Sequence, residues 1–343
     1  MTVMIGVDPH KRSHTAVAID DREDEMARIE VRATKRQVDQ LRKWATPFAD
    51  RVWAIESAGG LSYLLAQQLV AAGEQVVDVP ATLAARVRVL GTGRSNKNDP
   101  NDGRSVAVAA LRAPSLPSVQ TADHSAVLRL LAKRNLDLGR ERNRIVCRLH
   151  AMVCELVAGG IVQELRASRA EQLLTSFAPT TAVQSAKQAM ALELVADIRR
   201  VDAQIVDIQR RIRDAVVASK TTLTELYGVG PVIAALVIGY TGDVTRFATC
   251  DRFAAYNGTA PIELSSGGRI VHRLSRRGNR TLNYAIHMAA LAQIRQRTSE
   301  GRVYFDRKIA EGKTTREAIR ALKRRISDRI YRQLLVDADR QRA

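Results

Sequence analysis

The chain has 343 residues, of which 45% are hydrophobic and 4% aromatic. This length and hydrophobic share suffice for more than one domain with a buried core, and they exclude a disordered tail. The 54 lysine and arginine residues exceed the 36 acidic ones and give a formal net charge of +18, so nucleic acid is the expected partner. The low aromatic share argues against a single-strand binder that stacks bases on aromatic rings.

Two observations bear on compartment and on redox chemistry. The chain has no run of roughly eighteen apolar residues, and no signal peptide precedes the strand-like N-terminus MTVMIGVDPH, so we expect a cytoplasmic protein. A basic protein on a membrane surface is the alternative. Cys147, Cys154 and Cys250 lack a paired CxxC spacing, which predicts neither a zinc site nor a disulfide framework.

Strand and helix signals alternate over residues 1–121, which we predict to form one domain. Strand-like runs joined by short turns come first, and a strand–helix–strand alternation follows them. The expected strands are 3–8, 14–20, 26–33, 51–56 and 75–79, with helices at 34–45 and 61–73 and further helical segments behind them. This order predicts an α/β fold, a mixed sheet with flanking helices of the ribonuclease-H-like type.

A helical arm is predicted over residues 122–219. The stretches 127–157 and 191–217 have the apolar spacing of long amphipathic helices and are dense in Arg, Glu and Gln, and residues 176–186 carry a loop signal between them. The helices can pair as an antiparallel hairpin or as a coiled coil between subunits. We assign no chemistry to the arm.

Residues 220–343 are predicted to form a mainly α C-terminal domain. Gly228 and Gly230 stand between two helical stretches, and Pro231 opens the second one. This pattern resembles a helix-hairpin-helix turn, whose backbone N–H groups bind phosphate. A tight turn without a ligand would use the same glycines. The stretch 316–343 predicts a basic amphipathic helix.

A small-residue loop is predicted at Ser265, Ser266, Gly267 and Gly268. Taken alone, such a loop is typical of a flexible turn. Arginines follow it closely, and we expect them to bind nucleic acid. They are Arg269, Arg273, Arg276, Arg277 and Arg280.

The run GTGRSNKNDPNDGRS, residues 91–105, places two aspartates in a basic segment. Asp99 can cap a helix that has Pro100 as its first residue and Asp102 in its first turn. Alternatively, Asp99 and Asp102 lie at i and i+3 on one helix face and share a divalent cation with carboxylates from elsewhere.

Two further acids favour the metal interpretation. Asp8 ends the strand IGVD and Glu56 ends the strand VWAIE, which places both at the C-terminal edge of a sheet. Converging carboxylates repel unless cations neutralise them, and hard ions held in this way can act on a phosphodiester. Hard cations prefer oxygen, so we expect His10 and His14 to be surface residues and not ligands. The basic residues expected to hold phosphates nearby are Lys11, Arg12, Arg94, Lys97 and Arg104.

These blocks resemble the insertion-sequence one-ten family of transposases. Asp8 in GVDPHK, Glu56 in AIES, and Asp99 and Asp102 in KNDPNDG are similar to that family's DEDD tetrad, which lies in a domain that resembles the Holliday-junction resolvase RuvC. The C-terminal stretch from YGVGPVIAAL to LSRRGNRTLNYAI resembles the second conserved domain of the family.

The resemblance implies a DNA transposase or recombinase. The acids Asp8, Glu56, Asp99 and Asp102 would bind magnesium, and a serine of the small-residue loop would form a covalent bond to DNA. Ser266 matches that serine, and Ser265 is the alternative. The resemblance also implies a structured noncoding RNA that guides the protein to donor and target DNA. Joining two DNA partners requires several active sites, so we expect a homo-oligomer with the arm as its interface.

Other functions share parts of this pattern. A RuvC-like metal-dependent nuclease would use water in place of serine, and a site-specific DNA invertase would use the same chemistry on invertible DNA. A non-catalytic nucleic-acid-binding protein would use the aspartates as helix caps alone.

Overall fold

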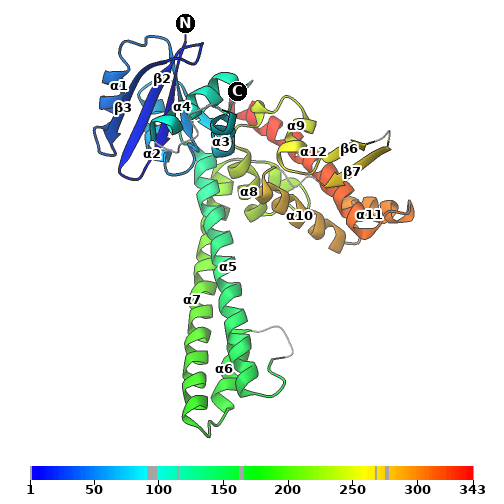
Figure 1. Ribbon diagram of the computed structural model, residues 1–343. Coiled ribbons are helices and arrows are strands. Elements are labelled where there is room, and N and C mark those ends of the chain that lie inside the picture. Colours follow the sequence, from blue (N-terminus) through cyan, green and yellow to red (C-terminus); the bar gives the residue numbers. More distant parts are fainter. Residues whose placement is uncertain are drawn as a thin grey trace. The chain divides into compact units, whose positions relative to one another are not determined.

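The computed structural model describes residues 2–90, 99–113, 116–161, 166–266, 269–274 and 278–342, with the backbone alone for residues 90, 99, 100, 262–266, 269–274 and 341. The chain divides into two compact units, Met1–Ala122 and Asp123–Ala343. Figure 1 colours them from blue to cyan and from green to red. In the described residues no helix is both long and apolar enough to cross a membrane.

The first unit is built on a mixed sheet with the strand order β3-β2-β1-β4-β5. The pairs β1/β2 and β2/β3 are antiparallel, whereas β1/β4 and β4/β5 are parallel. Its elements are β1 (Val3–Pro9), β2 (Ser13–Ile19), β3 (Glu25–Arg32), α1 (Gln37–Trp44), β4 (Arg51–Glu56), α2 (Tyr63–Ala71), β5 (Val76–Val79), α3 (Ala81–Leu90) and α4 (Asp99–Arg112). The predicted mixed sheet with flanking helices is confirmed.

Helices cover both faces of this sheet, as the alternation of side chains along a strand requires. Ile5 and Val7 of β1 pack with Leu41 of α1 and with α2 on one face. Ala54 of β4 packs with α3 and with Val106 of α4 on the other face. Each of the larger side chains buried there contributes about 1.5–3 kcal/mol to folding.

The second unit is mainly helical, with one small hairpin of strands. Its elements are α5 (His124–Leu156), α6 (Ala167–Ser176), α7 (Ala182–Ala218), the short 3-10 helix η1 (Leu223–Glu225), α8 (Pro231–Thr241), η2 (Val244–Arg246), α9 (Cys250–Tyr256), β6 (Pro261–Ser266), β7 (Arg269–Leu274), α10 (Arg280–Arg295), α11 (Glu300–Ala310) and α12 (Thr315–Arg342). We keep the separation of this unit into an arm (122–219) and a C-terminal domain (220–343) as a proposal.

Helices α5 and α7 run side by side as an antiparallel pair (Figure 1). Arg142 Nε lies 2.5 Å from Asp202 Oδ1, and further along α5 Glu155 Oε2 lies 2.5 Å from Lys187 Nζ. Residue numbers thus rise along α5 while they fall along its partner. These contacts agree with the first of the two predicted pairings, an antiparallel hairpin within the chain. A coiled coil between subunits stays a prediction.

Two predicted boundaries in this unit were wrong. The loop expected at 176–186 ends earlier, because the Thr181 side chain accepts a hydrogen bond from the backbone of Gln184 and caps α7 at Ala182. The stretch before Gly228 is a single 3-10 turn, η1, and not a helix. Lys220, just before it, has a φ of 52°. A right-handed helix does not continue through a residue with this φ.

Ser265 and Ser266 lie in a strand and not in the predicted small-residue loop. They are the last residues of β6, and the backbone pairs them with Ile270 and Arg269 of β7. The flanking runs PIEL and RIVHRL contain β-branched residues that favour strands. Gly267 and Gly268 lie outside the described residues.

Candidate functional site

The parallel register of β1 and β4 brings two predicted acids to one edge of the sheet. Gly6 pairs with Ala54 and Val7 with Ile55, so the next residues along each strand, Asp8 and Glu56, are neighbours at the C-terminal edge. The Asp8 side chain is buried, with 7% exposure, whereas Glu56 is half-buried.

A glycine contact brings α4 to the same edge. A Cβ at Gly6 would overlap the carbonyl oxygen of Gly103 and the amide nitrogen of Ala107, so the backbone of α4 lies directly on β1 and a larger residue would push it away. Asp102 precedes Gly103 in that helix and is buried, with 6% exposure. Side chains two residues apart in a strand share a face, and Asp8 therefore lies on the face of Gly6 that α4 covers.

Glu56 shares that face as well. It follows Ala54 by two residues in β4, and Ala54 packs against Val106 of α4. The structure thus places Asp8, Glu56 and Asp102 on one face at one edge. Asp99 starts α4, but its side chain lies outside the described residues.

Basic side chains accompany two of these acids. The Arg88 guanidinium of α3 donates a short hydrogen bond to Asp102 Oδ1, and His10 Nε2 lies 3.2 Å from Asp8 Oδ2. Arg88 was absent from the predicted site. Its position one helix before the aspartates is a weak signal, because the pairing depends on how α3 and α4 pack.

The donor chemistry suits a hard divalent cation. Carboxylate oxygens are the ligands that Mg²⁺ and Ca²⁺ prefer, and three carboxylates share this edge and face. In the described residues, however, three or more acid, histidine or cysteine side chains are not gathered closely enough to hold an ion. We therefore derive no ligand geometry.

His14 does not lie on the surface, contrary to the prediction. Its side chain sits on the face that packs against α1 and is 5% exposed, and Nε2 lies 3.1 Å from Gln37 Oε1. Burial lowers the pKa of His14, the Gln37 hydrogen bond opposes this, and the charge of His10 lowers it further. His14 is thus a neutral core residue, whereas the His10 side chain is 44% exposed.

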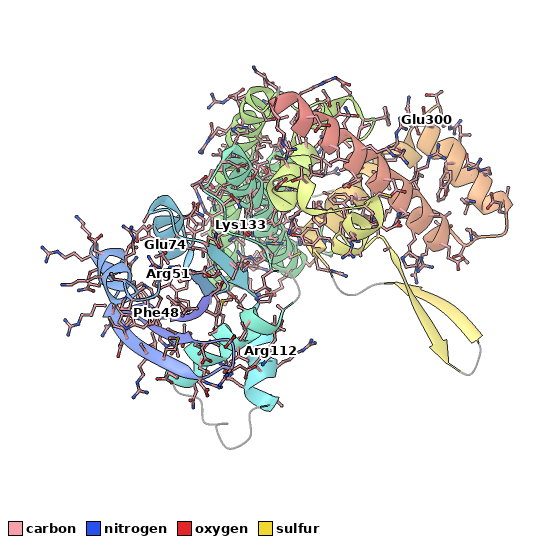
Figure 2. The ribbon with its side chains drawn as sticks, turned by 90° about the horizontal axis from the view of Figure 1, so that it is seen from above. Phe48, Arg51, Glu74, Arg112, Lys133 and Glu300 are labelled. Atoms are coloured by element: carbon pink, nitrogen blue, oxygen red, sulfur yellow. The ribbon has the colours of Figure 1, made fainter. Side chains whose placement is uncertain are left out.

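The opposite edge of the sheet holds a charged cluster that sequence reasoning missed. Glu74 accepts hydrogen bonds from Arg51 at 2.7 Å, from Trp53 Nε1 at 2.8 Å and from Arg42 at 3.1 Å. Arg51 also donates to the carbonyl of Phe48 at 2.8 Å. Figure 2 labels Phe48, Arg51 and Glu74, which lie next to one another. The cluster stabilises the N-terminal ends of β4 and β5. Arg51 and Trp53, two residues apart in one strand, are the sequence pattern that indicates this cluster. Their shared partner, Glu74, could not be predicted from the sequence.

The predicted basic residues are described in part. Lys11 and Arg12, in the turn after β1, are exposed. Arg280 is exposed as the first residue of α10, which Asn279 caps. Arg269 and Arg273 lie in β7, with their side chains outside the described part. Four others lie outside the described residues: Arg94, Lys97, Arg276 and Arg277.

The predicted phosphate-binding glycines have structural reasons of their own. Gly228 has a φ of +84°, and a Cβ there would lie 2.7 Å from the carbonyl oxygen of Ala289 in α10. Packing against α10 and a left-handed backbone therefore both require glycine. Gly230 is the N-cap of α8, and Pro231 is its first residue. Phosphate binding by this turn stays a prediction.

Comparison with known proteins gives two family matches along the chain. Residues 5–157 match the family model DEDD_Tnp_IS110, described as "Transposase". Residues 220–306 match a model described as "Transposase IS116/IS110/IS902 family". The two matches lie in the order expected from the motif blocks.

Relatives match over nearly the whole chain. "Insertion element IS116 uncharacterized 44.8 kDa protein" of Streptomyces clavuligerus is 27% identical over 97% of this chain and 94% of its own. "Insertion element IS900 uncharacterized 42 kDa protein" of Mycobacterium paratuberculosis is 28% identical over 94% and 93%. "Insertion element IS110 uncharacterized 43.6 kDa protein" of Streptomyces coelicolor is 39% identical over 31% of this chain and 26% of its own.

One solved structure bears on the expected fold type. The structure "T. thermophilus RuvC in complex with Holliday junction substrate" aligns with 35% of this chain and 100% of its own at 11% identity, with a TM-score of 0.27. A TM-score of this size carries no argument, so the fold rests on the sheet order and the packing described above.

Proposed function

Because this chain belongs to the IS110 family of transposases, we propose that it is a recombinase that cuts and rejoins the DNA of a mobile element through a serine nucleophile. The arrangement of Asp8, Glu56 and Asp102 on one face at one edge of the sheet is the observation that supports the proposal most directly. Two strand ends and one helix start from distant parts of the sequence bring these acids to the same edge, which supports a cation-dependent site there.

Asp8, Glu56, Asp99 and Asp102 are the residues that would hold magnesium. When bound, the ion would neutralise these carboxylates and polarise a phosphodiester. The chain itself positions the acids: the Gly6–Gly103 contact holds α4 on β1, and Arg88 keeps the Asp102 carboxylate compensated. His10 beside Asp8 contributes a second cationic neighbour whenever its ring is protonated.

Ser266 is the proposed nucleophile. Attack by its Oγ forms a serine–phosphorus bond and breaks the bond from phosphorus to one deoxyribose oxygen, which leaves with a proton as a hydroxyl. The serine proton passes to a base at the site, and the reverse step rejoins DNA and restores the serine. Ser265 is the alternative nucleophile, since both serines end β6.

Donor and target DNA, a noncoding guide RNA and further copies of the chain are the proposed partners. The net charge of +18 suits phosphate contacts with either nucleic acid. If pairing with a guide RNA selects the DNA, the protein needs few base contacts, which agrees with the 4% aromatic share.

A covalent-adduct assay tests the proposal. Full-length protein, RNA transcribed from the flanks of the element, labelled donor DNA and magnesium are incubated, and a protease-sensitive protein–DNA species is measured. We expect wild type and Ser265→Ala to form it, and Ser266→Ala and Asp102→Ala to lose it. Ser168→Ala, in α6 away from the hairpin, is the matched control for removing a hydroxyl.

Other outcomes would point to the alternatives. Loss of the adduct in Ser265→Ala but not in Ser266→Ala would move the nucleophile by one residue. Cleavage without an adduct in any variant would indicate a nuclease that uses water. Binding without cleavage, unchanged by EDTA, would indicate a non-catalytic nucleic-acid-binding protein. Activity without added RNA would remove the guide from the proposal.

A further inference from the structure

A cavity of about 360 Å³ lies between α12 and the residues that lead into the β6–β7 hairpin. Its volume falls within the range of sites for small ligands, about 300–1,000 Å³. One wall is formed by residues 258–261, and β6 begins on that wall at Pro261. The opposite wall consists of Ala321, four basic residues and one acid, and its charged residues are Lys313, Glu317, Arg320, Lys323 and Arg324.

Lys323 forms part of the cavity lining although its side chain is only 8% exposed. Its Nζ donates a hydrogen bond of 2.6 Å to Asn283 Oδ1. Among the described residues this neutral amide is its hydrogen-bond partner, and none of their carboxylates lies within ion-pair distance. The ammonium charge is thus buried beside a neutral acceptor.

The surroundings hold Asn283 in this orientation. Asn283 Nδ2 donates to the backbone carbonyl of Asn257 at 2.9 Å, which leaves its Oδ1 facing Lys323. The Asn257 side chain is fully buried and donates to Ser327 Oγ at 2.8 Å. Buried polar networks of this kind are rigid, because each member fixes the next. The position of the ammonium is therefore set in advance.

A buried cation without a counter-ion is costly, so its retention calls for a reason. Burial, together with a smaller effect of the nearby charge of Arg280, lowers the pKa of Lys323 to about 8. An anion in the cavity would oppose both effects, because it would supply an opposite charge that the described residues do not place beside the ammonium.

The other charged groups of the cavity add to this preference for an anion. Lys313 and Arg320 are exposed at the rim, where Arg320 also forms an ion pair of 3.9 Å with Glu317. Arg324 is already paired, with Asp251 at 2.5 Å and with Asp328 at 3.1 Å. The one acid of the lining, Glu317, accepts hydrogen bonds from Thr314 at 2.7 and 2.9 Å. The net charge that these lining residues present to a ligand is therefore positive.

We propose that this cavity binds a backbone phosphate of nucleic acid, with Lys323 as its buried cation and with Arg320 and Lys313 at its rim. The inference deepens the proposed function and rests on it, since it assigns a phosphate anchor at the foot of the hairpin that carries Ser266. The same chemistry fits a phosphate of DNA or of RNA, and the experiment separates the two.

The test measures the binding of full-length protein to a labelled DNA duplex and, separately, to a labelled RNA hairpin, at several salt concentrations. Lys323→Met removes the buried charge, Lys323→Arg keeps a charge there, and Arg320→Gln removes a rim charge without altering the core. Lys133→Met is the matched control, because Lys133 is an exposed lysine of α5. Thermal melting of each variant shows whether it is folded.

For one of the two nucleic acids, Lys323→Met should weaken binding by about 5- to 20-fold and lower the slope of log affinity against log salt by about one. Arg320→Gln should act in the same direction with a smaller effect, Lys323→Arg should restore most of the affinity, and Lys133→Met should change it least. Whichever nucleic acid responds is the source of the phosphate.

A second readout does not depend on affinity. Acetylation of Lys323 by acetic anhydride, followed by mass spectrometry, measures its neutral fraction. Saturating nucleic acid should slow this acetylation at least about 5-fold relative to Lys133, by occlusion and by raising the pKa of Lys323.

The outcomes separate the two proposals. Unchanged affinity and salt slope in folded Lys323→Met and in Arg320→Gln would overturn the phosphate site and leave the recombinase intact. A Lys323-dependent affinity together with no covalent adduct in wild type would keep the phosphate site and overturn the recombinase.

Discussion

The two edges of the sheet in the first unit hold their buried charges in different ways. At the N-terminal ends of β4 and β5, Glu74 accepts hydrogen bonds from three side chains, and its main partner, Arg51, also binds backbone carbonyls. At the C-terminal ends of β1 and β4, Asp8, Glu56 and Asp102 share a face, and two of them have basic neighbours. The charges at the first edge satisfy one another, whereas the second edge holds three acids on one face.

The difference teaches how a structural charge cluster can be told from a candidate site. Burial raises the pKa of Glu74, but hydrogen bonds from Arg51, Trp53 and Arg42 outweigh it, so the pKa lies below its ordinary value. A group held in this way stabilises the fold. Acids placed together on one face repel each other and cost stability unless a cation joins them, which is typical of sites for chemistry.

The largest expected effect is a loss of activity, which should follow a substitution at the C-terminal edge of the sheet and not one at the N-terminal edge. Glu56→Gln should lower magnesium-dependent adduct formation at least about 100-fold, because it replaces a charged oxygen ligand with a neutral amide. Its melting temperature should stay close to that of wild type, since Glu56 is half-buried at the sheet edge. Glu74→Gln, at the other edge, should retain the adduct wherever it is folded. Equal loss of adduct in the two folded variants would erase the distinction.

The next largest effect is a loss of stability on substitution at the N-terminal edge. Glu74→Gln should lower the free energy of unfolding of the first unit by about 3 kcal/mol, because Arg51, at 17% exposure, would lose its carboxylate. Urea titration followed by tryptophan fluorescence measures this unit, since Trp44 and Trp53 are the tryptophans of the chain.

An exposed ion pair supplies the control for that measurement. Glu23 pairs with Arg112, whose side chain is 65% exposed, and Glu23→Gln should cost only about 0.2–1 kcal/mol. Equal costs for Glu23→Gln and Glu74→Gln would show that the buried cluster adds no more than a surface pair.

A third experiment sharpens the role proposed for Asp102. Arg88→Gln removes its cationic partner and should lower the free energy of unfolding by about 1–3 kcal/mol in EDTA, because a buried carboxylate is left uncompensated. Magnesium should recover part of this loss in Arg88→Gln, and more than it stabilises wild type. Melting curves in EDTA and in magnesium measure the difference. A variant whose melting temperature ignores magnesium would argue against Asp102 as a ligand.

The smallest effect is the pH dependence of the Glu74 cluster. The pKa of Glu74 in the folded protein lies below its ordinary value of 4.5. Its contribution is therefore fully present above that value and is lost as the pH falls through the lowered folded pKa. The difference in unfolding free energy between wild type and Glu74→Gln should be constant above about pH 5.5 and shrink at more acidic pH. A difference that grows on acidification would contradict the assignment.

Much of this fold could be predicted from local patterns. The apolar alternation of β1 and β2 and the turn residues between them predict a hairpin, and the strand–helix–strand order that follows predicts the parallel pairs. The strand of Ser265 and Ser266 escaped prediction, because two serines before two glycines favour a loop locally while pairing with β7 favours a strand.

The acids themselves could be predicted as candidates because their positions at strand ends are local features. Their partners could not. Arg88 reaches Asp102 only through the packing of α3 against α4, and Lys323 meets Asn283 across a separation of 40 residues. Buried charge pairs depend on long-range geometry that no short pattern encodes.

The sequence by itself determined the basic charge, the order of strands and helices in the first unit and the acids at strand ends, since periodicity and composition are local properties. Only the tertiary structure decided which charges are compensated. The contact of Gly6 with Gly103 sets Asp102 over β1, and the network of Asn257 and Asn283 buries Lys323 beside a cavity. The physical reason is that desolvation and close packing act between residues far apart in the chain.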